Sequence, residues 1–259
     1  MMRPSKTLLL LAVSTGLLAL AEPQPLHPVP SPRFLPAVRL ATKDKSRNWA
    51  GYIVATSLKK PQDHSVTDVR GTWRVPDVSS SGAVDTSSAI WVGIDGATDH
   101  TVEQIGTEQD SNFGSPAYYA WYEMYPLGGQ YISTFPIAPG DQIKAEVQLV
   151  GTNLFLLTIS NLTQNAGFSI TEKHSAKRTS AEWIVEAPFL HRILPLADFQ
   201  SVTFSDCSAA IGGSGGAIND TNRQNLAITM ENFKTSTVLA QPSALTGDGT
   251  SFSVTWDHN

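Results

Sequence analysis

The sequence predicts an all-β protein, an antiparallel β-sandwich of jelly-roll (concanavalin-like) type. Short runs in which apolar and polar side chains alternate recur along the chain, and this alternation is the period of a half-buried strand. Turn-forming residues separate these runs at short intervals. No segment shows a convincing amphipathic-helix repeat. Many short strands with frequent turns are typical of two antiparallel sheets packed face to face.

The strands are expected one after another from residue 48 onward. Two alternating runs come first, one carrying Trp49 and the other ending at Pro76. A Ser- and Gly-rich loop at 78–88 then precedes a hairpin. An aromatic-rich run follows the hairpin, and aromatic residues favour strands. The expected strands cover residues 48–56, 66–76, 89–109 (the hairpin), 118–126, 141–150, 153–163, 168–175, 180–188, 201–209, 225–232 and 251–258.

The first 47 residues precede the predicted sandwich. Arg3 and Lys6 come before an apolar run at 8–20 that ends in a small-x-small cleavage site. This pattern predicts a secretory signal peptide at 1–21, since the run is too short for a membrane span. Residues 22–47 are Pro-rich and cannot form a sheet or helix interior, so we interpret them as a pro-segment. The β-sandwich domain is expected at 48–259, in a secreted, extracellular protein.

Composition limits the partners of this domain. From Arg47 onward the chain has 12 Lys and Arg against 21 Asp and Glu, a formal net charge of −9. An acidic domain is a poor nucleic-acid binder, and no later stretch could span a bilayer. We therefore expect no nucleic-acid or membrane partner, and a domain suited to an acidic medium. We also expect a monomer. Cys207 is the only cysteine, so no intrachain disulfide forms, and we expect it to be a small buried apolar residue.

The hairpin at 89–109 is the stretch around which the predicted site is organised. Alternation places Trp91, Gly93 and Asp95 on one face of its first strand, and Gln104 and Gly106 on one face of its second. A Trp, a carboxylate and an amide beside two glycines are unusual on the dry side of a sheet, because buried polar groups need partners. We interpret this face as the floor of a binding groove. The alternative is a solvent-facing hairpin with one packed Trp.

Two other strands add to the same kind of face. In the strand at 180–188, Trp183 and Val185 form the expected core face, so Glu182 points the other way. Simple solvent exposure of Glu182 and ordinary core packing of the aromatic residues are the alternatives. A concave sheet face with aromatic and convergent polar side chains favours a groove for an extended polymer. In the strand at 118–126, the side chains that share one face are Tyr119, Trp121, Glu123 and Tyr125.

Several segments resemble the glutamic peptidases, or eqolisins. They are NWAGY at 48–52, WVGIDG at 91–96 followed by EQIG at 103–106, AWYEMYP at 120–126, and SAEWIVE at 180–186 with PLADF and VTFSDC after it. The resemblance covers residues 48 to about 207. It implies a secreted, acid-acting endopeptidase on a β-sandwich that uses a Gln/Glu dyad, with no cofactor. The family's glutamine matches Gln104 and its glutamate matches Glu182. Residues that line its active site match Trp49, Trp91, Asp95 and Glu123.

The chain also departs from the family pattern. Met124 stands where the family has a second Trp, and Tyr119 stands at a position that is often acidic. The disulfides of some members cannot form with one cysteine. These differences concern the shape of the substrate subsites and the stability more than the chemistry.

The dyad chemistry is consistent with peptide hydrolysis, which needs an activated water and a stabilised oxyanion. Glu182 can take a proton from water and pass it to the leaving nitrogen. Gln104 offers an N–H donor to the oxyanion and a carbonyl acceptor to the water. An amide is neutral at any pH, so the donor persists in acid. Asp95 and Glu123 are expected to hold the dyad by hydrogen bonds.

Two other functions stay open at this point. Glu123 and Glu182 could be the acid and the nucleophile of a jelly-roll glycoside hydrolase, with carboxyl groups about 5–5.5 Å apart. A non-catalytic, lectin-like module could instead stack its aromatic side chains on sugar rings. The histidines show no metal-ligand spacing, so we expect no metal site. The GGSGG run at 212–216 matches a nucleophile motif, but no helix follows it, and a glycine-rich loop is the better interpretation.

Overall fold

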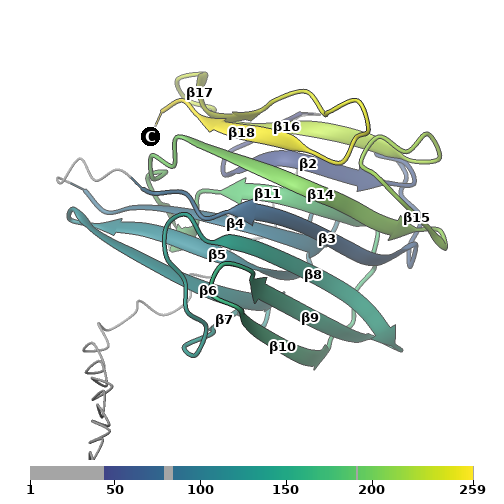
Figure 1. Cartoon of the computed structure of the whole chain (residues 1–259). Coiled ribbons are helices and arrows are strands. Elements are labelled where there is room, and N and C mark those ends of the chain that lie inside the picture. Colours follow the sequence, from purple (N-terminus) through teal and green to yellow (C-terminus); the bar gives the residue numbers. More distant parts are fainter. Residues whose placement is uncertain (1–43, 79–83, 191, 259) are drawn as a thin grey trace, which may run out of the picture. The chain divides into compact units, whose positions relative to one another are not determined.

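Every regular element of the described residues is a β-strand, which confirms the predicted all-β fold (Figure 1). The computed structural model describes residues 44–78, 84–190 and 192–258. The predicted signal peptide and residues 22–43 of the predicted pro-segment lie outside this range. The described residues all belong to one unit, Ser31–Asn259. None of them lies in a helix of the length and apolarity that a membrane crossing requires.

The strands form one hydrogen-bonded path that folds over into two layers (Figure 1). Sheet 1 contains, in spatial order, β10 (Ala166–Lys173), β9 (Leu154–Asn161), β8 (Gln142–Gly151), β3 (Val66–Arg74), β14 (Ser201–Ile211), β18 (Phe252–Trp256) and β17 (Thr237–Pro242). Sheet 2 contains β16 (Gln224–Asn232), β2 (Trp49–Ala55), β11 (Ser180–Glu186), β4 (Thr86–Ile94), β5 (Val102–Asn112), β6 (Ser115–Tyr125) and β7 (Gly129–Tyr131). Neighbours along this path are antiparallel, and β16 and β17 join the two sheets.

Four short strands lie off this path. β1 (Lys45–Ser46) pairs in parallel with β16, and β15 (Ser214–Gly216) pairs with β14. β12 (Phe189–Leu190) and β13 (Arg192–Ile193) pair only with each other among the described strands. Sheet pairing therefore begins at Lys45, three residues before the start predicted for the domain.

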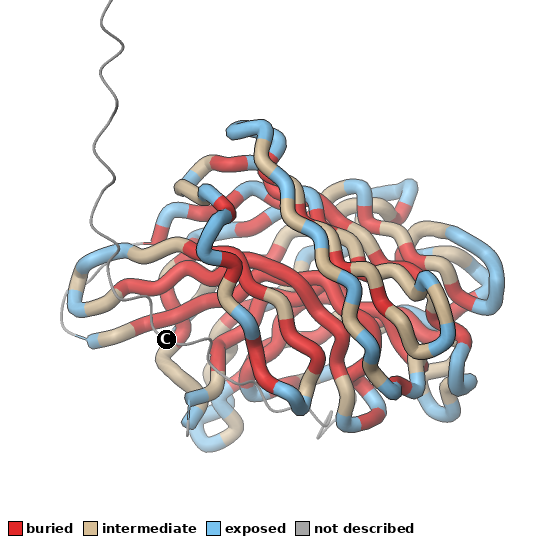
Figure 2. Tube along the Cα trace, turned by 90° about the horizontal axis from the view of Figure 1, so that it is seen from below, coloured by how far each residue is buried: buried red, intermediate tan, exposed pale blue. Residues whose placement is uncertain are grey.

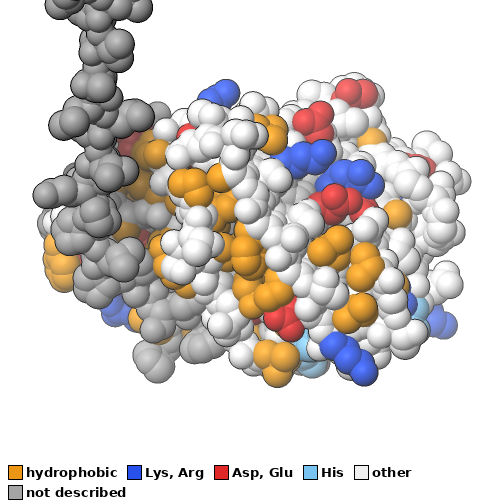
Figure 3. Space-filling view, turned by 60° about the horizontal axis from the view of Figure 1, so that its bottom comes forward, with side chains coloured by type: hydrophobic (Ala, Val, Ile, Leu, Met, Phe, Trp, Pro, Cys, Tyr) orange, Lys and Arg blue, Asp and Glu red, His pale blue; other side chains and the backbone are white. Residues whose placement is uncertain are grey.

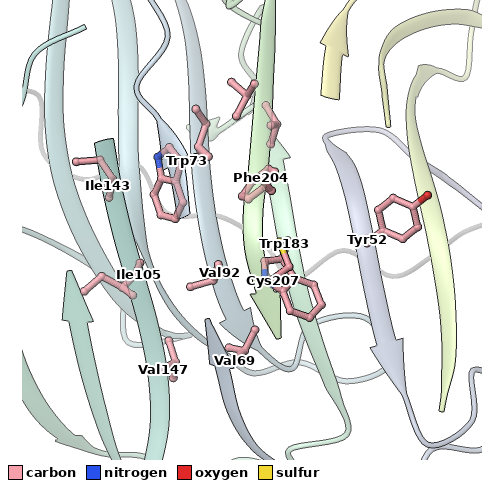
Figure 4. Packing of buried hydrophobic residues seen from close by; sticks show 14 of the residues in the cluster. Tyr52, Val69, Trp73, Val92, Ile105, Ile143, Val147, Trp183, Phe204 and Cys207 are labelled. Carbon is pink, nitrogen blue, oxygen red and sulfur yellow. The ribbon is translucent and has the colours of Figure 1, made fainter. Parts of the chain in front are cut away.

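The hydrophobic core lies between the two sheets. Trp183 and Val92 reach it from sheet 2, and Trp73 and Phe204 reach it from sheet 1 (Figure 4). The indole Nε1 of Trp183 donates a hydrogen bond of 2.7 Å to the carbonyl oxygen of Arg70, so this buried polar group is satisfied. Burial of each large apolar side chain contributes about 1.5–3 kcal/mol, which makes this interior the main source of the fold's stability.

Cys207 lies in the same core, as the sequence predicts (Figure 4). Asp206 has a left-handed φ of 52°, and the register between β14 and β3 shifts between Ser205 and Ser208. This β-bulge re-aims the side chain that follows it. The thiol of Cys207 is fully buried, and burial raises its pKa, so it is a packing residue.

The face of sheet 2 that points away from sheet 1 is called the outer face below. All residues of β2, β4 and β11 are buried, whichever face of sheet 2 their side chains point to. By contrast, β10 in sheet 1 has no buried residue. Figure 2 shows these long buried stretches in the middle of the unit. Polar side chains on the outer face of sheet 2 therefore lie in a protected setting, where charges and hydrogen bonds act strongly.

The molecular surface carries a mixture of charged and apolar side chains, unlike the buried outer face of sheet 2. On the side drawn in Figure 3, acidic and basic side chains lie close to one another and apolar side chains form small groups. The large exposed apolar residues include Phe113 and Leu127, each near the end of a hairpin of sheet 2. The visible part of this face thus carries no continuous field of one charge sign.

Candidate active site

Cross-strand pairing brings the two predicted dyad residues into one row. Glu182 on β11 lies opposite Gly93 on β4, Gly93 lies opposite Gln104 on β5, and Gln104 lies opposite Glu123 on β6. Residues directly opposite one another point to the same face of a sheet. Gly93 has no side chain, so the row has a gap, meaning one missing side chain, between Glu182 and Gln104. The Trp91 ring borders this position, with Cζ3 2.9 Å from where a Cβ of residue 93 would lie. Adjacent strands are about 4.8 Å apart, which places these two backbones about 10 Å apart.

Gln104 is held by its neighbour in this row. Its Nε2 donates a hydrogen bond of 2.7 Å to Oε2 of Glu123. Both side chains are buried, and Oε1 of each is without a hydrogen-bond partner among the described residues. Burial raises the pKa of Glu123 to about 8, although the Gln104 amide acts in the opposite direction. An amide nitrogen carries two hydrogens, so Gln104 keeps one donor for another group.

Glu182 is fully buried at the other end of the gap. Neither carboxylate oxygen makes a well-formed hydrogen bond with a described residue, although the Ser180 hydroxyl opposes the rise that burial causes in the pKa of Glu182. Burial raises the pKa of Glu182 well above its ordinary value, and the negative charges of Asp95, Asp99 and Glu103 add to the rise. A carboxylate in this environment is a stronger base than one in water. In acid the protonated form of Glu182 therefore predominates, and only its minor ionised fraction can take a proton from water.

Asp95 closes β4 and ties it to the segment that leads into β11. Its φ of 70° is left-handed, so the strand alternation ends there. Oδ1 accepts hydrogen bonds from the backbone N (2.6 Å) and the hydroxyl (2.9 Å) of Thr179, and Oδ2 accepts one from the backbone N of Arg178. Burial, followed by the charge of Asp99, raises the pKa of Asp95 to about 7. Among the described residues, Asp95 thus holds the backbone before Glu182 and makes no direct hydrogen bond to Glu182 or Gln104.

The predicted tryptophans line the next rows of the outer face. Trp91 lies opposite Gly106 on β5, and Gly106 lies opposite Trp121 on β6. The Trp49 and Trp91 rings meet edge to face, with centroids 4.9 Å apart and planes at 77°. The indole Nε1 of Trp121 is buried without a hydrogen-bond partner among the described residues. Tyr125, the last residue of β6, is half-buried and lies two residues after Glu123, opposite Val102 on β5.

One prominent member of this face, Glu186, is not among the site residues predicted from the sequence. It lies four residues after Glu182 on β11 and is fully buried. Its Oε2 accepts a hydrogen bond of 2.9 Å from Nε1 of Trp91, and its Oε1 accepts one of 2.7 Å from Nδ2 of Asn48. Alternation alone places Glu186 on the face of Glu182. Its two hydrogen-bond donors, however, lie on β4 and just before β2, and no local sequence pattern predicts those contacts.

A second missed carboxylate, Glu103, lies on the opposite face of β5. Its Oε1 is 2.7 Å from Nδ1 of His174. Burial raises the pKa of Glu103 well above its ordinary value and lowers the pKa of His174. Glu103 thus lies on the face of β5 opposite Gln104, and its charge adds to the raised pKa of Glu182.

Comparison with known proteins agrees with this arrangement. The model of the Peptidase A4 family matches residues 47–255. The chain belongs to the peptidase A4 family. It is therefore a glutamic endopeptidase, and the resemblance noted from its motifs is confirmed. The match decides against the glycoside hydrolase and the lectin-like module.

Individual relatives support this family assignment. The peptidase is 33% identical over 198 residues to Aspergillopepsin-2 of Aspergillus niger, covering 66% of this chain and 67% of that protein. It resembles scytalido-glutamic peptidase, solved with a peptide-based transition-state analogue, at a TM-score of 0.66 and 26% identity, covering 82% of this chain and 98% of that one. Aspergilloglutamic peptidase from Aspergillus niger gives a TM-score of 0.59 and 31% identity, covering 66% and 99%.

Proposed function

We propose that this peptidase hydrolyses peptide bonds in acid with Glu182 and Gln104 as a catalytic dyad. The observation that carries the proposal is the cross-strand row in which Gly93 leaves a gap between these two side chains. A scissile carbonyl and a water molecule that bind beside these two side chains would have a base on one side and an amide donor on the other. The similar scytalido-glutamic peptidase, solved with a peptide-based transition-state analogue, supports a polypeptide substrate.

The reaction needs one proton to move twice. Glu182, in its ionised form, takes a proton from the water as the water oxygen attacks the carbonyl carbon. The oxygen of the carbonyl becomes an oxyanion, which accepts a hydrogen bond from the free N–H of Gln104. Protonated Glu182 then gives the proton to the leaving nitrogen, and the C–N bond breaks. The Oε1 of Gln104, which lacks a partner among the described residues, can accept a hydrogen bond from the water.

The neighbouring side chains fit supporting roles. Glu123 orients Gln104 through the bond of 2.7 Å, and Asp95 fixes the entry into β11. Trp121 offers a buried indole N–H that no described residue accepts, which fits a hydrogen bond to a substrate carbonyl. Buried polar groups without a partner are rare in proteins and mark places where a ligand or water binds.

The export and maturation proposals rest on sequence. We propose that residues 1–21 direct secretion, that residues 22–47 are a basic pro-segment which the enzyme removes in acid, and that the mature protein is a monomer. Protonation of carboxylates weakens the charge attraction between a basic segment and the acidic domain, each surface pair contributing about 0.2–1 kcal/mol. On acidification, the wild type made without its signal peptide should shorten while Glu182→Gln stays at full length. Equal shortening of both would contradict self-processing.

The decisive experiment for the activity is a digest. Purified enzyme is mixed in acid with an unrelated denatured protein, and in parallel with a panel of glycans, and fragments are identified by mass. Cleaved peptide bonds with the wild type and none with Glu182→Gln are expected. Glu172→Gln on β10, in sheet 1, is the matched control and should cleave normally. Peptide cleavage by Glu182→Gln at the wild-type rate would contradict the dyad.

A further inference from the structure

Glu186 makes two hydrogen bonds that connect β11 to β4 and to the start of β2 in sheet 2. Asn48, which precedes β2, donates to Oε1 at 2.7 Å, and Trp91 on β4 donates to Oε2 at 2.9 Å. Glu186 itself lies on β11 and is fully buried. A buried carboxylate is costly unless its oxygens are hydrogen-bonded. Here each oxygen has a donor, so the cost of burying the carboxyl group is offset only while both donors stay in place.

The far edge of the Trp91 ring reaches the gap between the dyad residues. A Cβ atom built on Gly93 would lie 2.9 Å from Cζ3 of Trp91 and 3.1 Å from Cβ of Gln104. The six-membered part of the indole therefore borders the gap, while its Nε1 points to Glu186 in the opposite direction. Trp49 packs edge-on against the same ring at 4.9 Å. Trp91 thus connects Glu186 to the space in which the scissile group would bind.

We propose that Glu186 is a positioning residue for peptide hydrolysis, which acts by holding the Trp91 ring against Gly93 as the wall of the gap between Glu182 and Gln104. This inference rests on the proposed dyad. Without the Glu186 bond, the indole has lost the polar contact that fixes its ring orientation. A wall shifted by about 1 Å misplaces the reacting carbonyl, and a shift of that size can cost about a hundredfold in rate.

The geometry also predicts which substitution the site tolerates. Both partners of Glu186 are donors, so a glutamine there would place its own NH₂ against one of them. Asn48 can turn its side-chain amide and present Oδ1 to that NH₂, since an amide offers both a donor and an acceptor. Glu186→Gln should therefore keep the bond to Trp91. Glu186→Ala removes it, and Trp91→Phe removes the N–H from the other side while keeping an aromatic ring.

The test measures kcat and KM in acid for the matured enzyme, and thermal unfolding is recorded for each variant to show that it is folded. Glu186→Ala and Trp91→Phe should each lower kcat about 10- to 100-fold with KM changed less than about twofold, because the loss arises in the transition state. Glu186→Gln should keep kcat within about threefold, as should the control Glu172→Ala on β10. Because Glu186 acts through Trp91, the double variant Glu186→Ala/Trp91→Phe should be no slower than the worse single variant.

Each outcome decides the proposal. Wild-type kcat in folded Glu186→Ala, or losses that multiply in the double variant, would overturn it. So would a Glu186→Gln variant as slow as Glu186→Ala. If Glu186→Ala does not fold, Trp91→Phe decides alone, and wild-type kcat in that variant rejects the positioning role. Glu182→Gln, assayed beside these variants, separates the two levels: activity in that variant rejects the dyad itself, whatever Glu186 does.

Discussion

Replacing Gly93 by alanine tests whether the position between Glu182 and Gln104 has to lack a side chain. The new Cβ would lie 2.9 Å from Cζ3 of Trp91, 3.1 Å from Cβ of Gln104 and 3.2 Å from the carbonyl oxygen of Glu103. Carbon atoms normally pack about 3.5–4.0 Å apart, so the neighbours have to move. Trp91 is fully buried and cannot turn into solvent. The strain therefore falls on the two side chains that border the gap.

The expected magnitude follows from overpacking. One extra methyl group in a well-packed site costs about 1–3 kcal/mol of unfolding free energy. In a domain of this size, each kcal/mol lowers Tm by about 2–4 °C, so the drop should be about 2–12 °C. Displacement of Gln104 by about 1 Å should lower kcat by about a hundredfold. Both quantities can be measured on one sample, by thermal unfolding and by peptide cleavage in acid.

Gly167 on β10 provides the matched control. A Cβ there would meet nothing closer than 3.9 Å. Gly167→Ala should leave kcat unchanged and should raise stability by about 0.5–1 kcal/mol, because glycine is unfavourable inside a strand. If Gly93→Ala matches Gly167→Ala in both Tm and kcat, the gap is not needed and the reasoning about the row is wrong.

Three further predictions concern pH, inhibitors and Asp95. The pKa of Glu123 is raised to about 8 from an ordinary 4.5, so its contribution to stability is present below pH 4.5 and is lost as pH rises toward 8. Urea unfolding should show that this group lowers the unfolding free energy by up to about 1.4 kcal/mol per pH unit in this range, and Glu123→Gln should flatten that slope. Cleavage should survive chelators, pepstatin, and serine- and thiol-directed reagents, and complete loss with a chelator that zinc restores would contradict the dyad. Asp95→Asn should lower the unfolding free energy by about 1–3 kcal/mol, because its amide NH₂ would face backbone donors; an unchanged urea midpoint would show that Asp95 does not hold the segment before β11.

Strands and face assignment could be predicted from local sequence. Each predicted strand is present, with ends that differ by a few residues; for example, the prediction at 48–56 corresponds to β2 (Trp49–Ala55). Alternation placed Trp183 in the core and Glu182 on the other face, and both placements hold. Six strands of the described residues were missed, and all but β17 have only two or three residues, which is too few for an alternating pattern to show. They are β1, β7, β12, β13, β15 and β17.

Partners across strands could not be predicted from local sequence. The register between β11 and β4 decides that Gly93 separates Glu182 from Gln104, and register depends on pairing between segments almost ninety residues apart. The alternative of a solvent-exposed Glu182 is wrong, since the residue is fully buried. The expectation that Asp95 bonds to the dyad failed for a related reason. Its left-handed backbone turns the side chain to Thr179 rather than along the strand face.

The role of Gln104 as oxyanion donor is tested most directly by the turnover of Gln104→Ala. The cost of removing one oxyanion donor is about 2.7–4 kcal/mol of barrier, which corresponds to about 100- to 1000-fold in kcat. The measurement compares kcat of wild type and Gln104→Ala on one peptide substrate in acid, with Tm recorded to show that the variant is folded. We expect a loss of at least a hundredfold in a folded enzyme. Near wild-type turnover by Gln104→Ala would contradict the Gln/Glu dyad.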